Sequence, residues 1–264
     1  MAESIAAAFA AAKEEGRAAL MPYMMGGFPD AATSTAVAEA YAEAGADLVE
    51  LGVPYSDPLA DGPVIHAAGT RALASGATLE SVLADCERIA ARLPVVPMAY
   101  ANMILARGPE PFARALADAG AAGAIVPDLP LEEGGEVAEA LRAAGLALIP
   151  LVAPTTPAER RARICAEAEG FVYLVSDTRT TGERDEMPAT LTDLIAATKT
   201  DSPVPVAVGF GITTPEQAAE VGAAADGVIV GTRLVRAVDE AGDPVAAAAA
   251  VGEFIASARA AMAG

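Results

Sequence analysis

Four stretches of the sequence share one pattern and decide the fold: AGADLVELG at 44–52, AGAAGAIVPD at 119–128, AAGLALIPLV at 143–152 and VGAAADGVIVG at 221–231. In each of them, small residues lead through a glycine into a run of apolar residues. A glycine just past a helix is a common C-cap, because it adopts the left-handed backbone conformation without steric cost. The pattern therefore predicts a helix end, a tight turn and a strand, repeated along the chain.

Apolar runs of this kind occur eight times and are nearly continuous, which is typical of strands covered on both faces, as in parallel sheets. The predicted strands span 20–25, 47–53, 95–100, 123–128, 147–152, 171–176, 204–210 and 227–231. Stretches with helical spacing lie between them, at 31–44, 79–92, 110–119, 132–144, 158–168, 191–198 and 215–221. Parallel neighbours need such crossovers, so the alternation predicts a β/α architecture.

Eight strand–helix units in about 250 residues are the number found in a (β/α)8 TIM barrel. We expect this α/β fold for residues 1–264 as a single domain with an extra N-terminal helix, because no linker or change of composition interrupts the chain. The alternative is a doubly wound open sheet. Such a sheet carries a G-x-G-x-x-G fingerprint after its first strand, whereas residues 26–29 are Gly-Gly-Phe-Pro, and the barrel is therefore preferred.

The composition excludes several classes of function. The chain has 17 basic and 36 acidic side chains and a net charge of −19, and this charge repels nucleic-acid phosphates and anionic membranes. One His and two Cys without C-x-x-C spacing predict no zinc cluster, and no G-x-S-x-G motif is present. Without a signal peptide, or a run of roughly 18 apolar residues, we expect a soluble cytoplasmic protein with no metal site.

Glu50 is the first candidate for catalysis, because the functional side chains of TIM barrels lie at the carboxyl ends of the strands. It lies between Val49 and Leu51 in an apolar run. Burial of an ionised carboxylate is costly, so the pKa of Glu50 should rise and the protonated group can act as a general acid near neutral pH. The alternative is a structural ion pair, for which only Arg179 lies near a neighbouring strand end.

The loop after this strand carries two more carboxylates. Asp57 and Asp61 lie among prolines, which restrict the backbone of the loop. Either aspartate could be the N-cap of a following helix. For Asp61 this alternative is the weaker one, because Asp-Gly-Pro at 61–63 is a poor helix start.

Small residues follow the seventh and eighth predicted strands, as Gly-Phe-Gly-Ile-Thr at 209–213 and Gly-Thr at 231–232. Such residues let backbone N–H groups approach an anion at a helix N-terminus, and these two loops form the recurrent phosphate site of TIM barrels. A protein with a net charge of −19 needs local donors of this kind to hold a phosphate. The two motifs together predict a phosphate site.

With these residues assembled, the chain resembles the tryptophan synthase alpha chain family. The stretch LVELGVPYSDPLADGP at 48–63 matches that family's signature almost without departure. Shorter motifs agree in the same order between residues 20 and 235: Pro22-Tyr23, Tyr100-Ala101-Asn102, Val126-Pro127-Asp128-Leu129-Pro130, Tyr173-Leu174-Val175-Ser176, Thr181-Gly182, Gly209-Phe210-Gly211-Ile212 and Gly231-Thr232.

The resemblance implies a lyase that cleaves indole-3-glycerol phosphate to indole and glyceraldehyde 3-phosphate by a retro-aldol reaction. It implies that Glu50 is the acid/base that serves indole C3 and the substrate hydroxyl, and that Asp61 faces the indole N–H and stabilises developing positive charge. It also implies the substrate-binding residues: Tyr23 and Tyr100 at the indole, Tyr173 beside the indole and the hydroxyls, Thr181 as a link between two loops, and Gly182, Phe210, Gly211, Gly231 and Thr232 at the phosphate.

The resemblance implies no cofactor for this chain. It implies a beta chain as partner, in an α2β2 complex, which carries pyridoxal phosphate and consumes the indole. The loops at 54–61 and 177–187 match the segments that close at that interface. Departures from the family at Met24-Met25, Met103 and Asp177 concern loop closure and partner coupling more than the chemistry.

Three other hypotheses were weighed. A stand-alone lyase that releases free indole would share the catalytic residues and stays open. A phosphoribosyl isomerase needs carboxylates where Met25 and Val152-Ala153 stand, so it is disfavoured. A non-catalytic barrel is disfavoured by the presence of Glu50, Asp61 and Tyr173.

Overall fold

The computed structural model describes residues 2–175, 189–209 and 211–264. The expectations for Thr181, Gly182 and Phe210, and those for the loop at 177–187, lie outside the described residues.

The strands of the described residues form one parallel sheet, in the order β5-β4-β3-β2-β1-β9-β8-β7-β6. Their bounds are β1 Ala19–Met25, β2 Val49–Gly52, β3 Val95–Met98, β4 Gly123–Ile125, β5 Ala147–Ile149, β6 Leu151–Val152, β7 Val172–Val175, β8 Val206–Gly209 and β9 Gly227–Val230. Only Pro150 separates β5 from β6, so both edges of the sheet belong to one stretch of chain and the sheet closes into a barrel.

The predicted fifth strand is thus present in two pieces. Proline has no N–H to donate to a strand ladder, which interrupts the pairing at Pro150. Its carbonyl still accepts the Tyr173 N–H at 2.9 Å, which continues the contact with β7. The eight predicted strands and the barrel are confirmed.

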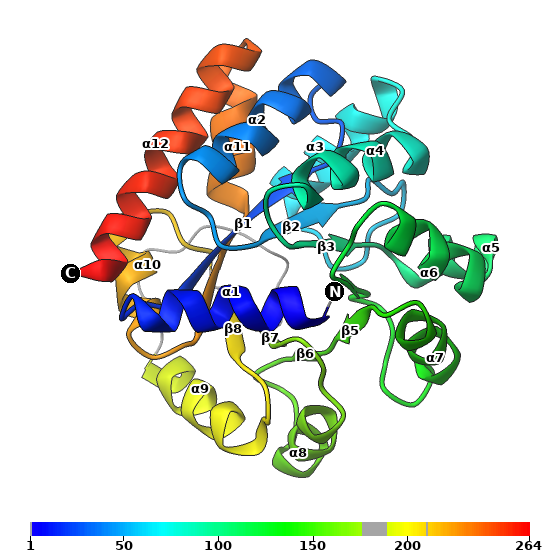
Figure 1. The fold of residues 1–264 in the computed structure, drawn as a ribbon, viewed down its shortest axis with the longest axis vertical. Coiled ribbons are helices and arrows are strands. Elements are labelled where there is room, and N and C mark those ends of the chain that lie inside the picture. Colours follow the sequence, from blue (N-terminus) through cyan, green and yellow to red (C-terminus); the bar gives the residue numbers. More distant parts are fainter. Residues whose placement is uncertain (1, 176–188, 210) are drawn as a thin grey trace.

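The helices from α2 onward surround the barrel, while α1 lies across it, as Figure 1 shows. Their bounds are α1 Ala2–Glu14, α2 Ala31–Glu43, α3 Pro63–Ala74, α4 Leu79–Ala90, α5 Ala101–Arg107, α6 Pro109–Asp118, α7 Gly135–Ala143, α8 Ala158–Ala166, α9 Ala189–Asp201, α10 Pro215–Gly222, α11 Thr232–Ala241 and α12 Pro244–Ala263. The predicted helical stretches are all found. The extra N-terminal helix is α1, and α3, α5, α11 and α12 lie outside the predicted ranges.

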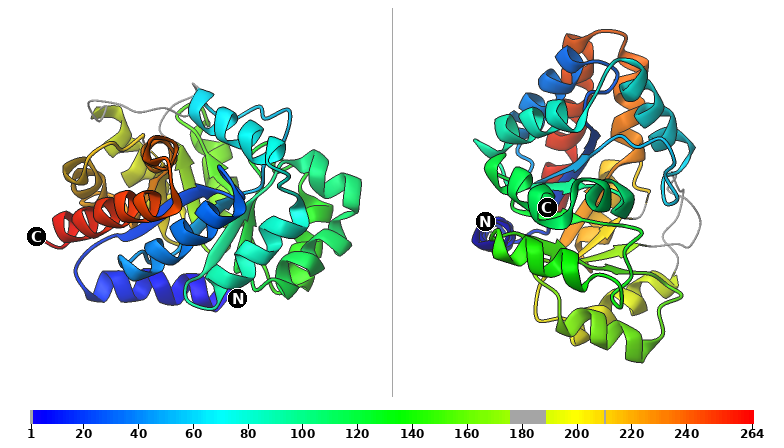
Figure 2. Two further views of the ribbon diagram at one scale, coloured as in Figure 1. Left: turned by 90° about the horizontal axis from the view of Figure 1, so that it is seen from above. Right: turned by 90° about the vertical axis from the view of Figure 1, so that its right-hand side faces the viewer.

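Helix α1 covers the amino end of the barrel, which leaves the carboxyl end for a site. The left view of Figure 2 shows α1, in blue, across one end of the strands. Ile5, Phe9 and Ala12 of α1 pack into the barrel interior with Met21 and Phe171. The Phe9 and Phe171 rings lie 5.7 Å apart, so α1 and the barrel share one apolar core.

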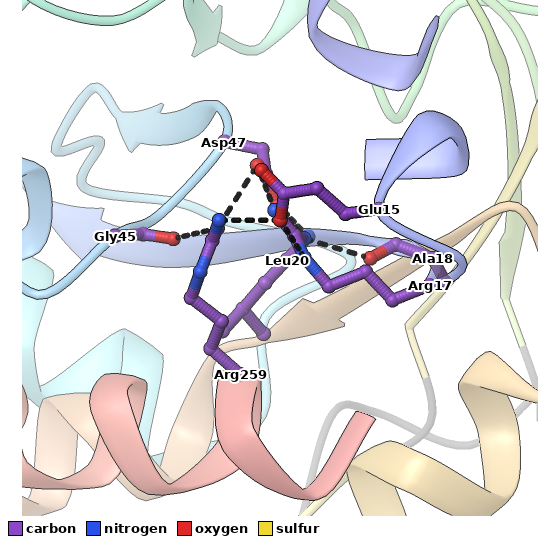
Figure 3. Close-up of polar contacts among 7 residues, drawn as sticks. All are labelled: Glu15, Arg17, Ala18, Leu20, Gly45, Asp47 and Arg259. Atoms are coloured by element: carbon purple, nitrogen blue, oxygen red, sulfur yellow. Dashed lines mark hydrogen bonds and ion pairs between the residues drawn. The ribbon is translucent and has the colours of Figure 1, made fainter. Parts of the chain in front are cut away.

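A network of ion pairs around the buried Arg17 joins the segment after α1 to α12 and to the turn before β2 (Figure 3). Arg17 is 7% exposed and donates two hydrogen bonds to Asp47, at 2.5 and 2.8 Å. Asp47 also accepts the Leu20 N–H at 2.7 Å. Arg259 of α12 donates to Gly45 O at 2.9 Å and to Glu15 at 2.6 Å. The network therefore fastens α12 and the end of α1 to the start of the strands.

By length and composition α12 is apolar enough to cross a membrane, with a mean hydropathy of 1.4, which the sequence analysis did not expect. Its hydropathy comes largely from alanine, and it carries Glu253 and Arg259. It packs against α2, α10 and α11. Its buried side chains are Ala247, Val251, Phe254, Ile255 and Ala258. In this structure it belongs to the helical ring.

Candidate active site

A cavity of about 810 Å³ opens among the strand ends and the loops that follow them. Most of the predicted site residues within the described part of the chain line it: Tyr23, Glu50, Asp61, Tyr173, Gly211, Gly231 and Thr232. These residues come from strands that are far apart in the sequence. Tyr100 is not among the lining residues, and it reaches the site through Asp61.

Glu50 is the most unusual group in the cavity. It lies on β2 and is 1% exposed, and among the described residues neither carboxylate oxygen has a hydrogen-bond partner. Burial, together with the nearby charge of Asp61, raises the pKa of Glu50 to about 8. The alternative of a structural ion pair finds no support in the described residues. A carboxyl group with this pKa is protonated at neutral pH and can both donate and accept a proton.

Two tyrosines lie close to Glu50. Tyr23 is opposite Glu50 in the register of β1 and β2, and Tyr173 lies on β7. Burial, and then nearby negative charge that includes Glu50, raises the pKa of both phenols well above the ordinary value. Both hydroxyls therefore stay protonated and can donate hydrogen bonds to a substrate.

Glycines on neighbouring strands make room for these rings. A β-carbon on Gly52 would lie 2.1 Å from the Tyr23 hydroxyl, and one on Gly209 would lie 2.8 Å from the Tyr173 hydroxyl. Gly209 was expected to serve an anion. In the structure its lack of a side chain leaves space for the Tyr173 ring. Packing therefore explains the glycine at the end of β8.

Asp61 is held by Tyr100. The Tyr100 hydroxyl donates to Asp61 Oδ1 at 2.9 Å and accepts the Ala60 N–H at 3.1 Å. Burial is the largest effect and raises the pKa of Asp61 overall, while the Tyr100 hydrogen bond and the charge of His66 oppose the rise. The pKa of Asp61 is thus set by opposing effects, whereas that of Glu50 is only raised.

Neither aspartate of the loop caps α3, so that alternative is wrong. The N-cap is Gly62, and Pro63 takes the first helical position, where its missing N–H does no harm. Asp57 accepts a hydrogen bond from the adjacent Ser56 instead. His66 is exposed on α3.

The start of α11 fits an anion. This helix begins at Thr232 after Gly231, and no side chain of the described residues caps it. In contrast, the start of α10 is occupied by a capping box of Thr214 and Gln217. Free N–H groups at a helix N-terminus attract anions, and Gly231 and Thr232 both face the cavity.

Comparisons with known proteins agree with this geometry. A family model described as tryptophan synthase alpha chain matches residues 9–262. The chain belongs to the tryptophan synthase alpha chain family. The alpha chain of Synechococcus sp. (strain CC9902) is 50% identical over 236 residues, which cover 88% of each chain. That of Carboxydothermus hydrogenoformans is 48% identical over 233 residues, covering 88% of this chain and 87% of that one.

Solved structures of the tryptophan synthase family share the fold. A chain of Mycobacterium tuberculosis tryptophan synthase superposes with a TM-score of 0.90 at 37% identity, covering 98% of this chain and 97% of that one. Tryptophan synthase subunit alpha of Legionella pneumophila gives a TM-score of 0.86 at 37% identity, with 98% of both chains covered. The family resemblance drawn from the sequence and the TIM-barrel fold are confirmed.

One further polar residue of this tryptophan synthase alpha fold, Asp128, contributes to the site without having been predicted from the sequence. Asp128 follows β4 and accepts the Ala101 N–H at 2.8 Å. It lines the cavity and lies next to the loop that carries Tyr100. Its position just past a strand's carboxyl end was a usable signal. Among the described residues, no group of three or more His, Cys, Asp and Glu could hold a metal.

Proposed function

We propose that the chain cleaves indole-3-glycerol phosphate to indole and glyceraldehyde 3-phosphate, as the alpha chain of a tryptophan synthase. The observation that carries the proposal is Glu50, a buried carboxyl group without a partner among the described residues, whose pKa is about 8 and which faces the same cavity as Asp61. Membership of the tryptophan synthase alpha chain family supports it.

The reaction needs one group that gives a proton and then takes one. Protonated Glu50 donates to C3 of the indole, which becomes a cationic indolenine. Its carboxylate then accepts the proton of the hydroxyl next to the breaking bond. The electron pair of that C–C bond moves into the indolenine, which restores the indole ring and leaves an aldehyde. Glu50 ends protonated, so the cycle is balanced.

The remaining residues stabilise and orient the substrate. Asp61, as a carboxylate, faces the indole N–H and stabilises the positive charge of the indolenine. Tyr23 and Tyr173 bind the ring and the hydroxyls from β1 and β7, with Tyr100 behind Asp61. The phosphate binds backbone N–H groups at the start of α11, with Gly211, Gly231 and Thr232. Thr181, Gly182 and Phe210 complete this assignment.

The proposal includes a partner. The family is that of a two-chain synthase, and one of the structural relatives is described as an aminoacrylate-bound form of tryptophan synthase. Leu59 lines the cavity and is 80% exposed, so its apolar side chain is available for a contact with another protein. We propose a beta chain as partner in an α2β2 complex, a cytoplasmic location, one domain over 1–264, and no cofactor in this chain.

The test is an assay of the purified chain with indole-3-glycerol phosphate, in which indole and glyceraldehyde 3-phosphate are measured in equal amounts. We expect slow cleavage by the chain alone and faster cleavage when a beta chain is added, because ordering of loops completes such sites. No cleavage under either condition would contradict the proposal. Full activity alone, unchanged by a beta chain, would favour the stand-alone lyase, which no observation now supports.

A further inference from the structure

Three loops at the cavity mouth are joined by hydrogen bonds that end at Asp61. One phenol, that of Tyr100, donates to the Asp61 carboxylate at 2.9 Å and accepts the N–H of the preceding residue, Ala60, at 3.1 Å. The orientation of the carboxylate and of its backbone therefore depends on where Tyr100 is held. Tyr100 itself belongs to the next loop, directly before α5.

Asp128 fixes the residue that follows Tyr100. Its Oδ1 accepts the N–H of Ala101, the first residue of α5, at 2.8 Å. The first N–H groups of a helix have no partner within the helix, and a carboxylate there is favourable. Because Asp128 comes from the loop after β4, this bond sets the start of α5 relative to the barrel. It therefore also sets the position of Tyr100.

A second contact of Tyr100 is with the ring of Tyr55. The Tyr55 and Tyr100 rings stack with centroids 5.3 Å apart and an interplanar angle of 29°. The Tyr55 hydroxyl in turn accepts a hydrogen bond from Asn102 Nδ2 at 2.9 Å. The Tyr100 ring thus packs against a loop residue, Tyr55, that is itself tied to the first turn of α5.

Asp128 has a second influence on Tyr100. Burial raises the pKa of the Tyr100 phenol, and the charges of Asp61 and Asp128 raise it further. A phenol with a raised pKa remains protonated, so it remains the donor in the bond to Asp61. In the part of the chain that the structure describes, no ion pair involves Asp128, so a salt bridge does not explain its place there.

We propose that Asp128 is a positioning residue: by fixing the first turn of α5 it holds Tyr100 against Asp61 and so sets the orientation of that carboxylate. The kinetic part of this inference rests on the proposed function. The geometric part does not, because the hydrogen bonds exist without substrate.

The protonation of Asp61 reports on this contact. Asp61 shares the cavity or its edge with Glu50 on β2, Tyr23 on β1, His66 on α3 and Tyr100 before α5. Of these, the Tyr100 hydrogen bond and the charge of His66 lower its pKa against the effect of burial. If Tyr100 moves away, its hydrogen bond no longer counteracts the effect of burial on Asp61. The pKa of Asp61 should then rise.

The experiment compares Asp128→Ala and Asp128→Asn in the full-length chain. The amide of Asn keeps an oxygen that can accept the Ala101 N–H, whereas Ala keeps none. Ala101→Pro removes the same bond from the donor side, at a helix position where proline is tolerated. Asp243→Ala is the matched control, because Asp243 also accepts N–H groups at the start of a helix, two of them in α12, and does not line the cavity.

Two quantities are measured, the titration of the Asp61 carboxyl carbon by NMR and kcat/KM for indole-3-glycerol phosphate as a function of pH. The Asp61 signal is assigned by its loss in Asp61→Asn. We expect Asp128→Ala and Ala101→Pro to raise the midpoint of the Asp61 titration, and we expect the same of Tyr100→Phe. Both variants should also lower kcat/KM roughly fivefold to tenfold, which is the effect of losing one hydrogen bond. Asp128→Asn should stay within about twofold of the wild type, and Asp243→Ala should move neither quantity.

An Asp128→Ala protein that folds, as judged by circular dichroism, and keeps both the wild-type Asp61 titration and kcat/KM would overturn the proposal. So would an Asp128→Asn protein as impaired as Asp128→Ala, because the charge would then matter and not the contact. If Asp128→Ala does not fold, Ala101→Pro decides by the same criteria. The two proposals can fail separately. If the wild-type chain has no lyase activity but the Asp128 variants still shift the Asp61 titration, the proposed function is refuted and the positioning role is supported.

Discussion

Glu50 and Asp61 face the same cavity from a strand and from the loop after it, and the charge of Asp61 is one cause of the raised pKa of Glu50. Burial is the larger cause. Burial raises the pKa of Asp61 as well, but Tyr100 and His66 oppose that rise, whereas both effects of the described residues on Glu50 raise its pKa. The two carboxyl groups are therefore suited to different protonation states. One can donate a proton while the other stabilises a cation.

The first prediction concerns the pH dependence of catalysis. The reaction begins with protonated Glu50, whose pKa is about 8. The pH profile of kcat/KM reports the groups of the free enzyme. We therefore expect kcat/KM for indole-3-glycerol phosphate to fall as the pH rises above about 8. A profile that is level up to pH 10 would contradict the assignment of Glu50 as the acid.

The second prediction concerns stability. The pKa of Glu50 is about 8 in the folded chain and 4.5 as an ordinary glutamate, so between these values the folded chain holds a proton that the unfolded chain lacks. Stability is then lost as the pH rises towards 8. Glu50→Gln does not titrate. It should match the wild type at pH 4 and exceed its free energy of unfolding by about 2–4 kcal/mol at pH 9. Denaturant unfolding at both values tests this, and a destabilised variant at pH 9 would contradict it.

The third prediction concerns the space beside Tyr173. A β-carbon on Gly209 would lie 2.8 Å from the Tyr173 hydroxyl, so Gly209→Ala must displace the ring. We expect about 1–3 kcal/mol of destabilisation from overpacking and a raised KM. Adding Tyr173→Phe should recover part of the stability, because it removes the closest atom. Gly135→Ala is the control, since a β-carbon there meets nothing within 4 Å. Additive effects in the double variant would argue against the contact.

The fourth prediction separates a buried ion pair from an exposed one. Asp47→Ala leaves Arg17, which is 7% exposed, without its bidentate partner, and should cost about 3–5 kcal/mol in the free energy of unfolding. Asp239→Ala removes the partner of Arg71, and this pair is half-exposed, so the loss should be about 0–1 kcal/mol. Chemical denaturation of both variants gives the comparison. Equal losses would contradict the structural role of the network at Asp47.

Much of the fold was predictable because the glycine-then-apolar pattern is local. The predicted strand bounds differ from the observed ones by a few residues. The break at Pro150 depends on how the barrel closes, which a local pattern does not show. Helix α5 has seven residues, too few to show a helical period. Helix α12 is rich in alanine and shows no polar face to contrast with an apolar one.

The candidate site was predictable where a residue type is chemically unusual. A glutamate inside an apolar strand indicated Glu50, and Asp-Gly-Pro drew attention to Asp61. The packing of Tyr173 over Gly209 is a contact between strands, so the sequence suggested an anion there instead. The role of Asp128 depends on the distance between two loops. The expectations for Thr181, Gly182 and Phe210 remain predictions.

The most direct test of the account is the rate of indole formation by Glu50→Gln compared with the wild type. Gln keeps the shape of Glu50 but cannot transfer the proton. We expect a folded variant that still binds indole-3-glycerol phosphate but whose kcat is lower by roughly 10²–10⁴-fold. A folded Glu50→Gln chain that forms indole at close to the wild-type rate would contradict it.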